Sequence, residues 1–298
     1  MKQNQEQTSG YFFTFLAFLT WGLFPIYWKM LSHIPALEVL AHRIFWSLLF
    51  VILLLFWKKK LHLGDIFKNK KALSTLIVTG ILIGSNWGIF IYAVNAGYII
   101  EASLGYYITP LLNVGLGMLF LNERLNKIQF MALLLAAGAV LYLTIDFGRF
   151  PWISILLAST FAVYGLLKKL SGVEALPSLA IETLVLAPFA LSYIIFKMSE
   201  GTGALFAESR TIDFLLIMAG VVTTMPLYWF GLGAKRISLT SVGFMQYIGP
   251  TIMLFLGIFM YHEGFPQEKQ IAFSAIWVAL ALYSYSIVRD YRKRKESR

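Results

Sequence analysis

The chain has 298 residues, of which 58% are hydrophobic and only 13% are charged, and its mean hydropathy is +0.71. Soluble domains carry about 25% charged residues, so the composition excludes an ordinary soluble protein and indicates a membrane protein with many spans. The formal net charge of +10 suits basic loops beside a membrane better than nucleic-acid binding. The absence of cysteine excludes disulfides, thiolate metal ligands and thiol nucleophiles.

Ten apolar stretches have the length and composition of membrane-spanning helices. The sixth is short, so a count of nine spans stays open. The first stretch lacks a small-residue cleavage pattern, and we expect it to remain as a span rather than be removed as a signal peptide. The sequence therefore predicts an all-α membrane protein with ten transmembrane helices, at residues 10–31, 36–57, 72–95, 99–121, 127–145, 150–167, 178–197, 212–234, 239–260 and 269–288.

The basic residues are distributed unevenly between the two sides of this arrangement. If the N-terminus is inside, 19 of the 25 lysines and arginines face the cytoplasm, and of the other six, five face outward and Arg43 lies within a span. Cytoplasmic loops carry the excess of basic residues in membrane proteins. We therefore expect both termini to be cytoplasmic and the basic tail after residue 288 to be disordered.

An internal repeat relates the two halves of the chain. A shift of 140 positions aligns residues 107–117 with residues 247–257. Tyr107, Pro110 and Gly117 then align with Tyr247, Pro250 and Gly257. Each half, 1–148 and 149–298, then holds five spans, and because five is odd the second half enters the membrane from the opposite side. Inverted repeats are typical of secondary transporters, whose site lies at the repeat interface near the midplane. An ancestral relic in a channel or an enzyme is the alternative.

Two spans in equivalent positions place polar groups and a proline on one helix face. Tyr106, Pro110 and Asn113 follow a helical spacing, and Gln246 and Pro250 are their counterparts. Polar groups in lipid need internal partners or water, so we expect this face to line a cavity; a packing kink is the alternative for the prolines. The candidate cavity residues are Trp21, Asn86, Tyr92, Tyr106, Pro110, Asn113, Tyr164, Gln246, Tyr247 and Pro250.

Charged residues and glycines within the spans also predict specific contacts between helices. Arg43 is costly inside a span unless it pairs or snorkels. Glu101 is its candidate partner, as an ion pair or gate, and simple snorkelling of Arg43 is the alternative. Glu182 is within reach of Lys168 and Lys169, where a structural ion pair is favoured over proton carriage. The three glycines at residues 80, 84 and 88 predict close helix packing, and Asn86 faces away from them, toward the cavity or a hydrogen bond to an adjacent helix.

The sequence offers no convincing chemistry of another kind. The four histidines are scattered without ligand spacing, so no metal site is expected, and no catalytic or phosphate-binding motif is present. Glu123 and Arg124 look like a solvated pair at a span boundary. We expect no enzyme activity and no cofactor.

Five segments resemble the bacterial RarD proteins, in the EamA branch of the drug/metabolite transporter superfamily. They are HRIFWS, NWGIFIYAVN, EASLGYYITPLLNVGLGMLFLNERL, GVVTTMPLYWFG and GFMQYIGP. Thr109 stands where the family usually has an asparagine before Pro110. The resemblance implies two inverted five-helix EamA repeats, residence in the bacterial plasma membrane and a permease role.

These observations predict a small-molecule transporter that works by alternating access in the lipid bilayer. The cavity is expected between spans one, three, four, six, eight and nine, aromatic and rich in amides, with little fixed charge. Such a lining favours neutral, zwitterionic or amphiphilic ligands. The transporter is a candidate homodimer. The principal alternative to a transport function is a non-transporting membrane protein, either a scaffold or an intramembrane enzyme.

Overall fold

The computed structural model describes residues 2–59, 63–262 and 264–296, and this part of the chain is helical without strands. Within these described ranges, ten spans are long and apolar enough to cross a membrane. This confirms the predicted fold class. The helices are α1 (Lys2–Lys29), α2 (Ala36–Trp57), α3 (Gly64–Lys68), α4 (Lys70–Asn95), α5 (Ile99–Leu121), α6 (Lys127–Asp146), α7 (Trp152–Leu170), α8 (Ala175–Ser199), α9 (Arg210–Ala234), α10 (Leu239–Gln246), α11 (Ile248–Phe255), the π-helical η1 (Leu256–Met260) and α12 (Gln267–Glu296).

The ninth span is divided, whereas its counterpart in the first half is continuous. It consists of α10, α11 and η1, with the break at Tyr247. Pro250 has no N–H to donate to the carbonyl of residue 246, which weakens the helix at that point. Pro110 lies inside the unbroken α5. The two helices related by the repeat therefore differ in continuity.

The C-terminal tail differs from its prediction, because α12 continues as a helix to Glu296. The segment after residue 288 contains no glycine or proline and is rich in lysine and arginine, which are good helix formers.

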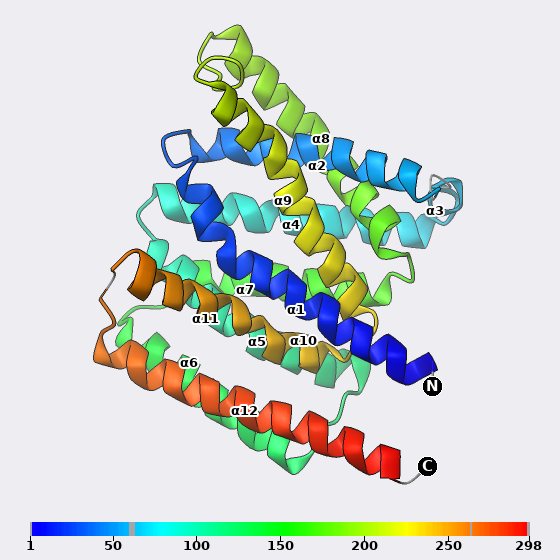
Figure 1. Cartoon of the computed structure of the whole chain (residues 1–298), viewed down its shortest axis with the longest axis vertical. Coiled ribbons are helices and arrows are strands. Elements are labelled where there is room, and N and C mark those ends of the chain that lie inside the picture. Colours follow the sequence, from blue (N-terminus) through cyan, green and yellow to red (C-terminus); the bar gives the residue numbers. More distant parts are fainter. Residues whose placement is uncertain (1, 60–62, 263, 297–298) are drawn as a thin grey trace.

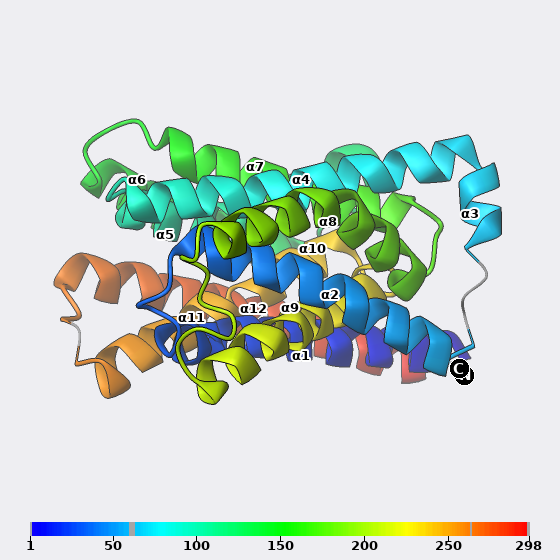
Figure 2. The ribbon, with the colours of Figure 1, turned by 90° about the horizontal axis from the view of Figure 1, so that it is seen from above.

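Both ends of the chain lie at the same end of the bundle, which we call the terminal end (Figure 1). At one edge α6 packs against α12, and at the other α2 packs against α8. Seen from above, α4 and α7 lie on one side of the bundle and α1 and α9 on the other (Figure 2). The space between these two pairs holds the cavity described below.

The helix contacts repeat when the first five spans are exchanged for the second five. Thus α5 packs on α7 as α11 packs on α1, α4 on α7 as α9 on α1, and α4 on α8 as α9 on α2. The pairs α2–α8, α5–α10 and α6–α12 map onto themselves. Near this pseudo-twofold axis, the Tyr247 hydroxyl donates to the carbonyl of Tyr107 at 3.2 Å, and these two residues are related by the sequence repeat.

Two of the three glycines on α4 provide close packing against α8. A Cβ atom at Gly80 would lie 3.2 Å from the Glu182 backbone, and one at Gly84 would lie 2.5 Å from the Leu186 side chain. A Cβ atom added at Gly88 would have no neighbouring atom within 4 Å. The predicted glycine contact therefore holds at the first two positions and not at the third.

Candidate substrate cavity

A cavity of about 600 Å³ lies between α1, α2, α4, α5, α7, α9 and the α10–α11 segment. It extends from residues in the middle of the spans to Ser32 and Ile34, in the turn after α1 at the end opposite the terminal end. Val94 and Tyr106 on its wall are each 37% exposed, so this part of the wall is not fully packed. Its walls include the spans expected from the sequence and add α2.

Eight aromatic side chains lie on the cavity wall. Trp21 on α1 contacts Phe161 on α7 with ring centroids 5.7 Å apart, and the two rings join the sides of the cavity at its inner limit. The other aromatic residues on the wall are Phe18, Phe24, Trp28, Trp87, Phe90 and Tyr106.

Five of the ten residues proposed from the sequence lie on the wall: Trp21, Asn86, Tyr106, Gln246 and Pro250. Asn86 satisfies both of its interpretations, because it borders the cavity and its amide donates to the Leu157 carbonyl at 2.8 Å and to the Thr160 hydroxyl at 2.9 Å. These two bonds fix its side chain against α7.

Asn113 and Pro110 lie behind the wall rather than on it. Asn113 is 1% exposed, and its amide donates to Gln246 Oε1 at 2.8 Å, so it holds in place a residue that does face the cavity. Pro110 is buried where α5 meets α10, and a Cβ atom at Gly243 would lie 2.7 Å from its carbonyl. Both residues face the second half of the protein rather than the cavity.

The remaining three candidates, all tyrosines, also lie outside the lining. Tyr247, at the break between α10 and α11, lies in the core formed with α6 and α12. Tyr92 is 52% exposed at the end of α4 and lies beside Tyr98 and Trp152. Tyr164 is fully buried beyond Phe161, toward the terminal end.

The expected pairing of Arg43 with Glu101 is wrong. Glu101 is 1% exposed and forms an ion pair with Arg149 at 2.8 Å, because α5 packs against α7 and the loop before it. Arg43 faces the cavity instead, and its Nε donates to the Thr223 hydroxyl at 3.0 Å. The cavity therefore contains the positive charge of Arg43, which the sequence interpretation had placed in an ion pair with Glu101.

The sequence interpretation also missed other wall residues, notably Phe161 and Thr223. Phe161 lies four residues after Leu157, which is the spacing of one helix face. Thr223 accepts a hydrogen bond from Arg43 Nε and also borders the cavity. The spacing on α7 was a signal that could have identified Phe161.

Beyond the cavity, packed aromatic rings close the bundle toward the terminal end. Phe230 contacts Phe18, Trp21 and Phe161 with centroid distances of 6.1, 5.7 and 5.5 Å, and it stacks on Tyr164. Phe230 and Tyr164 are both 0% exposed. This aromatic layer ends the cavity near the middle of the bundle.

A buried ion pair lies immediately beyond the aromatic layer. Lys168 and Glu182 are 0% and 1% exposed, and the Lys168 ammonium lies 2.7 Å from both carboxylate oxygens. The hydroxyls of Thr79, Ser178 and Tyr164 donate to the same carboxylate at 2.8, 3.0 and 3.3 Å. The network ties α4, α7 and α8 together, as a structural ion pair would.

Glu123 makes a further contact that closes the terminal end, and it is not the solvated boundary residue we expected. Its two oxygens accept hydrogen bonds from the backbone N–H groups of Leu239 and Thr240 at 2.7 and 2.8 Å. These groups belong to the first turn of α10, where a carboxylate also suits the helix dipole. Gly117 leaves room for the carboxylate, since a Cβ there would lie 2.6 Å from Glu123 Oε2. The contact links α5 to α10 across the two halves.

Replacing Glu123 with alanine is expected to lower the free energy of unfolding by about 1–3 kcal/mol, because two charge-assisted hydrogen bonds to a helix start are lost. Glu123→Gln is expected to fall between the native protein and the alanine variant, since one side-chain oxygen still accepts. Chemical unfolding in detergent micelles measures the effect. Glu208→Ala, which removes an exposed contact to His33, is the control; an equal loss in that variant would contradict the assignment.

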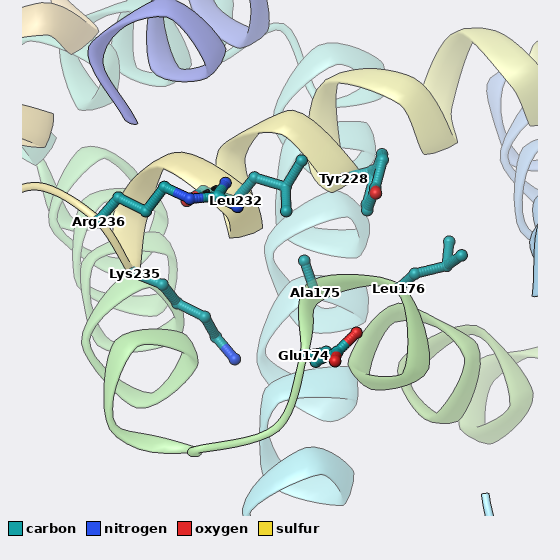
Figure 3. Close-up of a pocket in the computed structure, with 7 residues that line it drawn as sticks. All are labelled: Glu174, Ala175, Leu176, Tyr228, Leu232, Lys235 and Arg236. Atoms are coloured by element: carbon teal, nitrogen blue, oxygen red, sulfur yellow. Dashed lines mark hydrogen bonds between the residues drawn. The ribbon is translucent and has the colours of Figure 1, made fainter. Parts of the chain in front are cut away.

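A smaller pocket of about 370 Å³ opens at the terminal end between the start of α8 and the end of α9 (Figure 3). The Lys235 side chain and the Glu174 carboxylate enter it from opposite sides. Burial is the main cause that lowers the pKa of Lys235 to about 8; nearby Lys168 lowers it further, whereas Glu182 and Glu174 oppose the shift. Among the described residues, this pocket shares no lining residue with the main cavity.

The inverted symmetry and the central cavity define a class, that of polytopic membrane proteins built like secondary transporters. The model of the EamA-like transporter family matches residues 8–145. An uncharacterized transporter, YojE, of Bacillus subtilis is 44% identical over 98% of this chain and 99% of its own, and protein RarD of Escherichia coli K12 is 38% identical over 99% of both. The chain belongs to the RarD group of the EamA-like transporter family.

A solved crystal structure supports the fold alone. It superposes with a TM-score of 0.73 over 95% of this chain and 99% of its own, at 16% sequence identity. The ten spans among the described residues and the bacterial relatives support a multi-pass transporter of small molecules in the bacterial inner membrane.

Proposed function

We propose that this transporter is a secondary transporter that works by alternating access, with the cavity open to the outside in the present conformation. The observation that carries the proposal is the one-sided cavity. It reaches the end opposite the termini, whereas the aromatic layer, the Lys168–Glu182 pair and Glu123 close the terminal end.

The charge distribution supports this direction. The terminal end carries the loops with most of the lysines and arginines, which membrane proteins keep in the cytoplasm. With the terminal end inside, the cavity faces outward. Both termini are then cytoplasmic.

The pseudo-symmetry supplies the second conformation of the cycle. Because α1 with α9 and α4 with α7 are equivalent pairs, the two halves can exchange their packing at the two ends, as inverted repeats do in alternating access. Opening inward must break the Glu123 contact with α10 and part the aromatic layer. The break at Tyr247 between α10 and α11 is the hinge we assign to this movement.

Release of solutes from proteoliposomes tests the proposal. Vesicles are loaded with a defined mixture of amino acids, nucleosides and aromatic carboxylates, and mass spectrometry follows their loss. Native protein is expected to release at least one solute faster than protein-free vesicles, and Val94→Trp, which fills the cavity wall, is expected to stop that release. Leu119→Trp, at a position that is 77% exposed and off the cavity, is the matched control. A scaffold would release nothing in any of these vesicles.

A further inference from the structure

Arg43 is the one charged side chain on the cavity wall among the residues that the structure describes. It lies seven residues into α2, about 10 Å from the helix start at 1.5 Å per residue. A charge at such a depth is costly unless it is paired or solvated, and charged residues inside spans often mark substrate pathways.

The contacts of Arg43 fix its guanidinium while leaving part of it free. The Nε donates to Thr223, and the guanidinium carbon lies 4.5 Å from the Trp28 ring and 5.0 Å from the Trp87 ring. Within the described ranges the two terminal nitrogens have no protein partner, and neither is among the buried polar atoms that lack one. These two nitrogens are therefore accessible from the cavity.

No carboxylate in the described part of the chain forms an ion pair with Arg43. Glu101 pairs with Arg149. Glu38, on the same helix, is buried and accepts a hydrogen bond from the backbone of Ala204 at 2.6 Å. The counter-charge that Arg43 lacks in the protein can be supplied by a ligand in the cavity.

We propose that the substrate is a small organic anion, in which a carboxylate or similar oxyanion is joined to a flat apolar or aromatic body. This inference rests on the proposed transport function and names its substrate class. The planar guanidinium matches a carboxylate with two parallel hydrogen bonds. Trp28 and Trp87 flank that contact, and the body of the ligand packs on the aromatic wall at Trp21, Phe90 and Phe161.

The same wall discriminates against other charge types. An amine would place a second cation beside Arg43. A zwitterion would bring an ammonium group that finds no carboxylate among the described wall residues. The lining expected from the sequence favours neutral, zwitterionic or amphiphilic ligands; of these, an amphiphilic anion fits the observed wall better than a neutral or zwitterionic ligand.

Four probes with one phenylpropyl body separate these cases: 3-phenylpropionate, 3-phenylpropionamide, phenylalanine and 3-phenylpropylamine. Their binding to the full-length protein in lipid nanodiscs is measured by calorimetry. The anion is expected to bind at least tenfold more tightly than the amide and the zwitterion, and the amine is expected not to bind. Equal or tighter binding of any other probe, or no binding of the anion, overturns the assignment.

Variants of Arg43 locate the effect. Arg43→Lys keeps the charge but loses the planar fork, and about tenfold weaker binding of 3-phenylpropionate is expected. Arg43→Gln is expected to remove the preference for the anion over the amide, while Arg210→Gln, at an exposed position outside the cavity, leaves it unchanged. Native affinity for the anion in Arg43→Gln overturns the proposal. If Arg43→Gln does not fold, as judged by thermal unfolding without ligand, the lysine variant and the probe ranking decide the case.

The outcome is separable from that of the proposed function. Solute release that Val94→Trp stops, without preference for the anionic probe, retains the transporter and rejects the anion class. Tight binding of the anion without any solute release retains the anion class and rejects the transporter.

Discussion

Replacing Lys168 with methionine is expected to lower the free energy of unfolding by about 3–5 kcal/mol, because the Glu182 carboxylate then remains buried without its counter-charge. Three hydroxyls still donate to that carboxylate, but hydrogen bonds do not replace the lost positive charge. Unfolding of the purified protein in bicelles, followed by helical circular dichroism, measures the change.

The double variant Lys168→Met with Glu182→Leu is the informative control. Exchanging a whole buried ion pair for apolar groups is often close to neutral, so most of the lost stability is expected to return. An exposed pair serves as a second control. His33→Ala removes a contact to Glu208, and such an exposed contact contributes about 0–1 kcal/mol to the free energy of unfolding. If Lys168→Met unfolds no more easily than His33→Ala, the ion pair does not hold α7 and α8 together.

Gly220→Ala is expected to cost about 1–3 kcal/mol or more, because the new methyl group has no space. Its Cβ would lie 2.4 Å from the Trp46 backbone carbon and 2.7 Å from the Ser47 nitrogen, so α2 and α9 must separate. Their separation also weakens the hydrogen bond from the Ser47 hydroxyl to the Gly220 carbonyl, now 3.1 Å long. Thermal unfolding in the same bicelles measures the loss.

Gly88→Ala is the matched control for this prediction. It is also a glycine within a span, but no atom lies within 4 Å of its added Cβ. Alanine has the better helix propensity, by about 1 kcal/mol, so this variant is expected to be as stable as the native protein or slightly more stable. Equal losses in the two variants would show that glycine flexibility, rather than helix contact, sets the stability.

The sequence predicted the spans and their symmetry because both depend on local patterns. Apolar runs of sufficient length define the ten helices, and the repeat of residues 107–117 at 247–257 is visible without any knowledge of packing. The contact between Tyr107 and Tyr247 shows how directly that repeat marks the axis. For the cavity, helical spacing identified Tyr106, Gln246 and Pro250.

The charged contacts were not predictable in the same way, because they depend on which helices become neighbours. Arg43 and Glu101 lie near the same end of the bundle, yet α5 packs on α7, so Arg149 reaches Glu101 first. Glu123 similarly finds its partners in the backbone of α10, which carries no charge that a sequence would reveal. Residue types alone show neither which backbone N–H groups are available to a carboxylate nor which helices become neighbours.

Reciprocal accessibility of the two ends tests alternating access most directly. The chain has no cysteine, so single cysteines at Val94, on the cavity wall, and at Ala234, buried at the terminal end, are the only thiols. Their labelling rates by a water-soluble maleimide are compared with and without Glu123→Ala, and Thr202→Cys in an exposed loop corrects for reagent access. We expect Glu123→Ala to slow labelling at Val94 and speed it at Ala234, whereas rates that rise together, or do not change, would contradict alternating access.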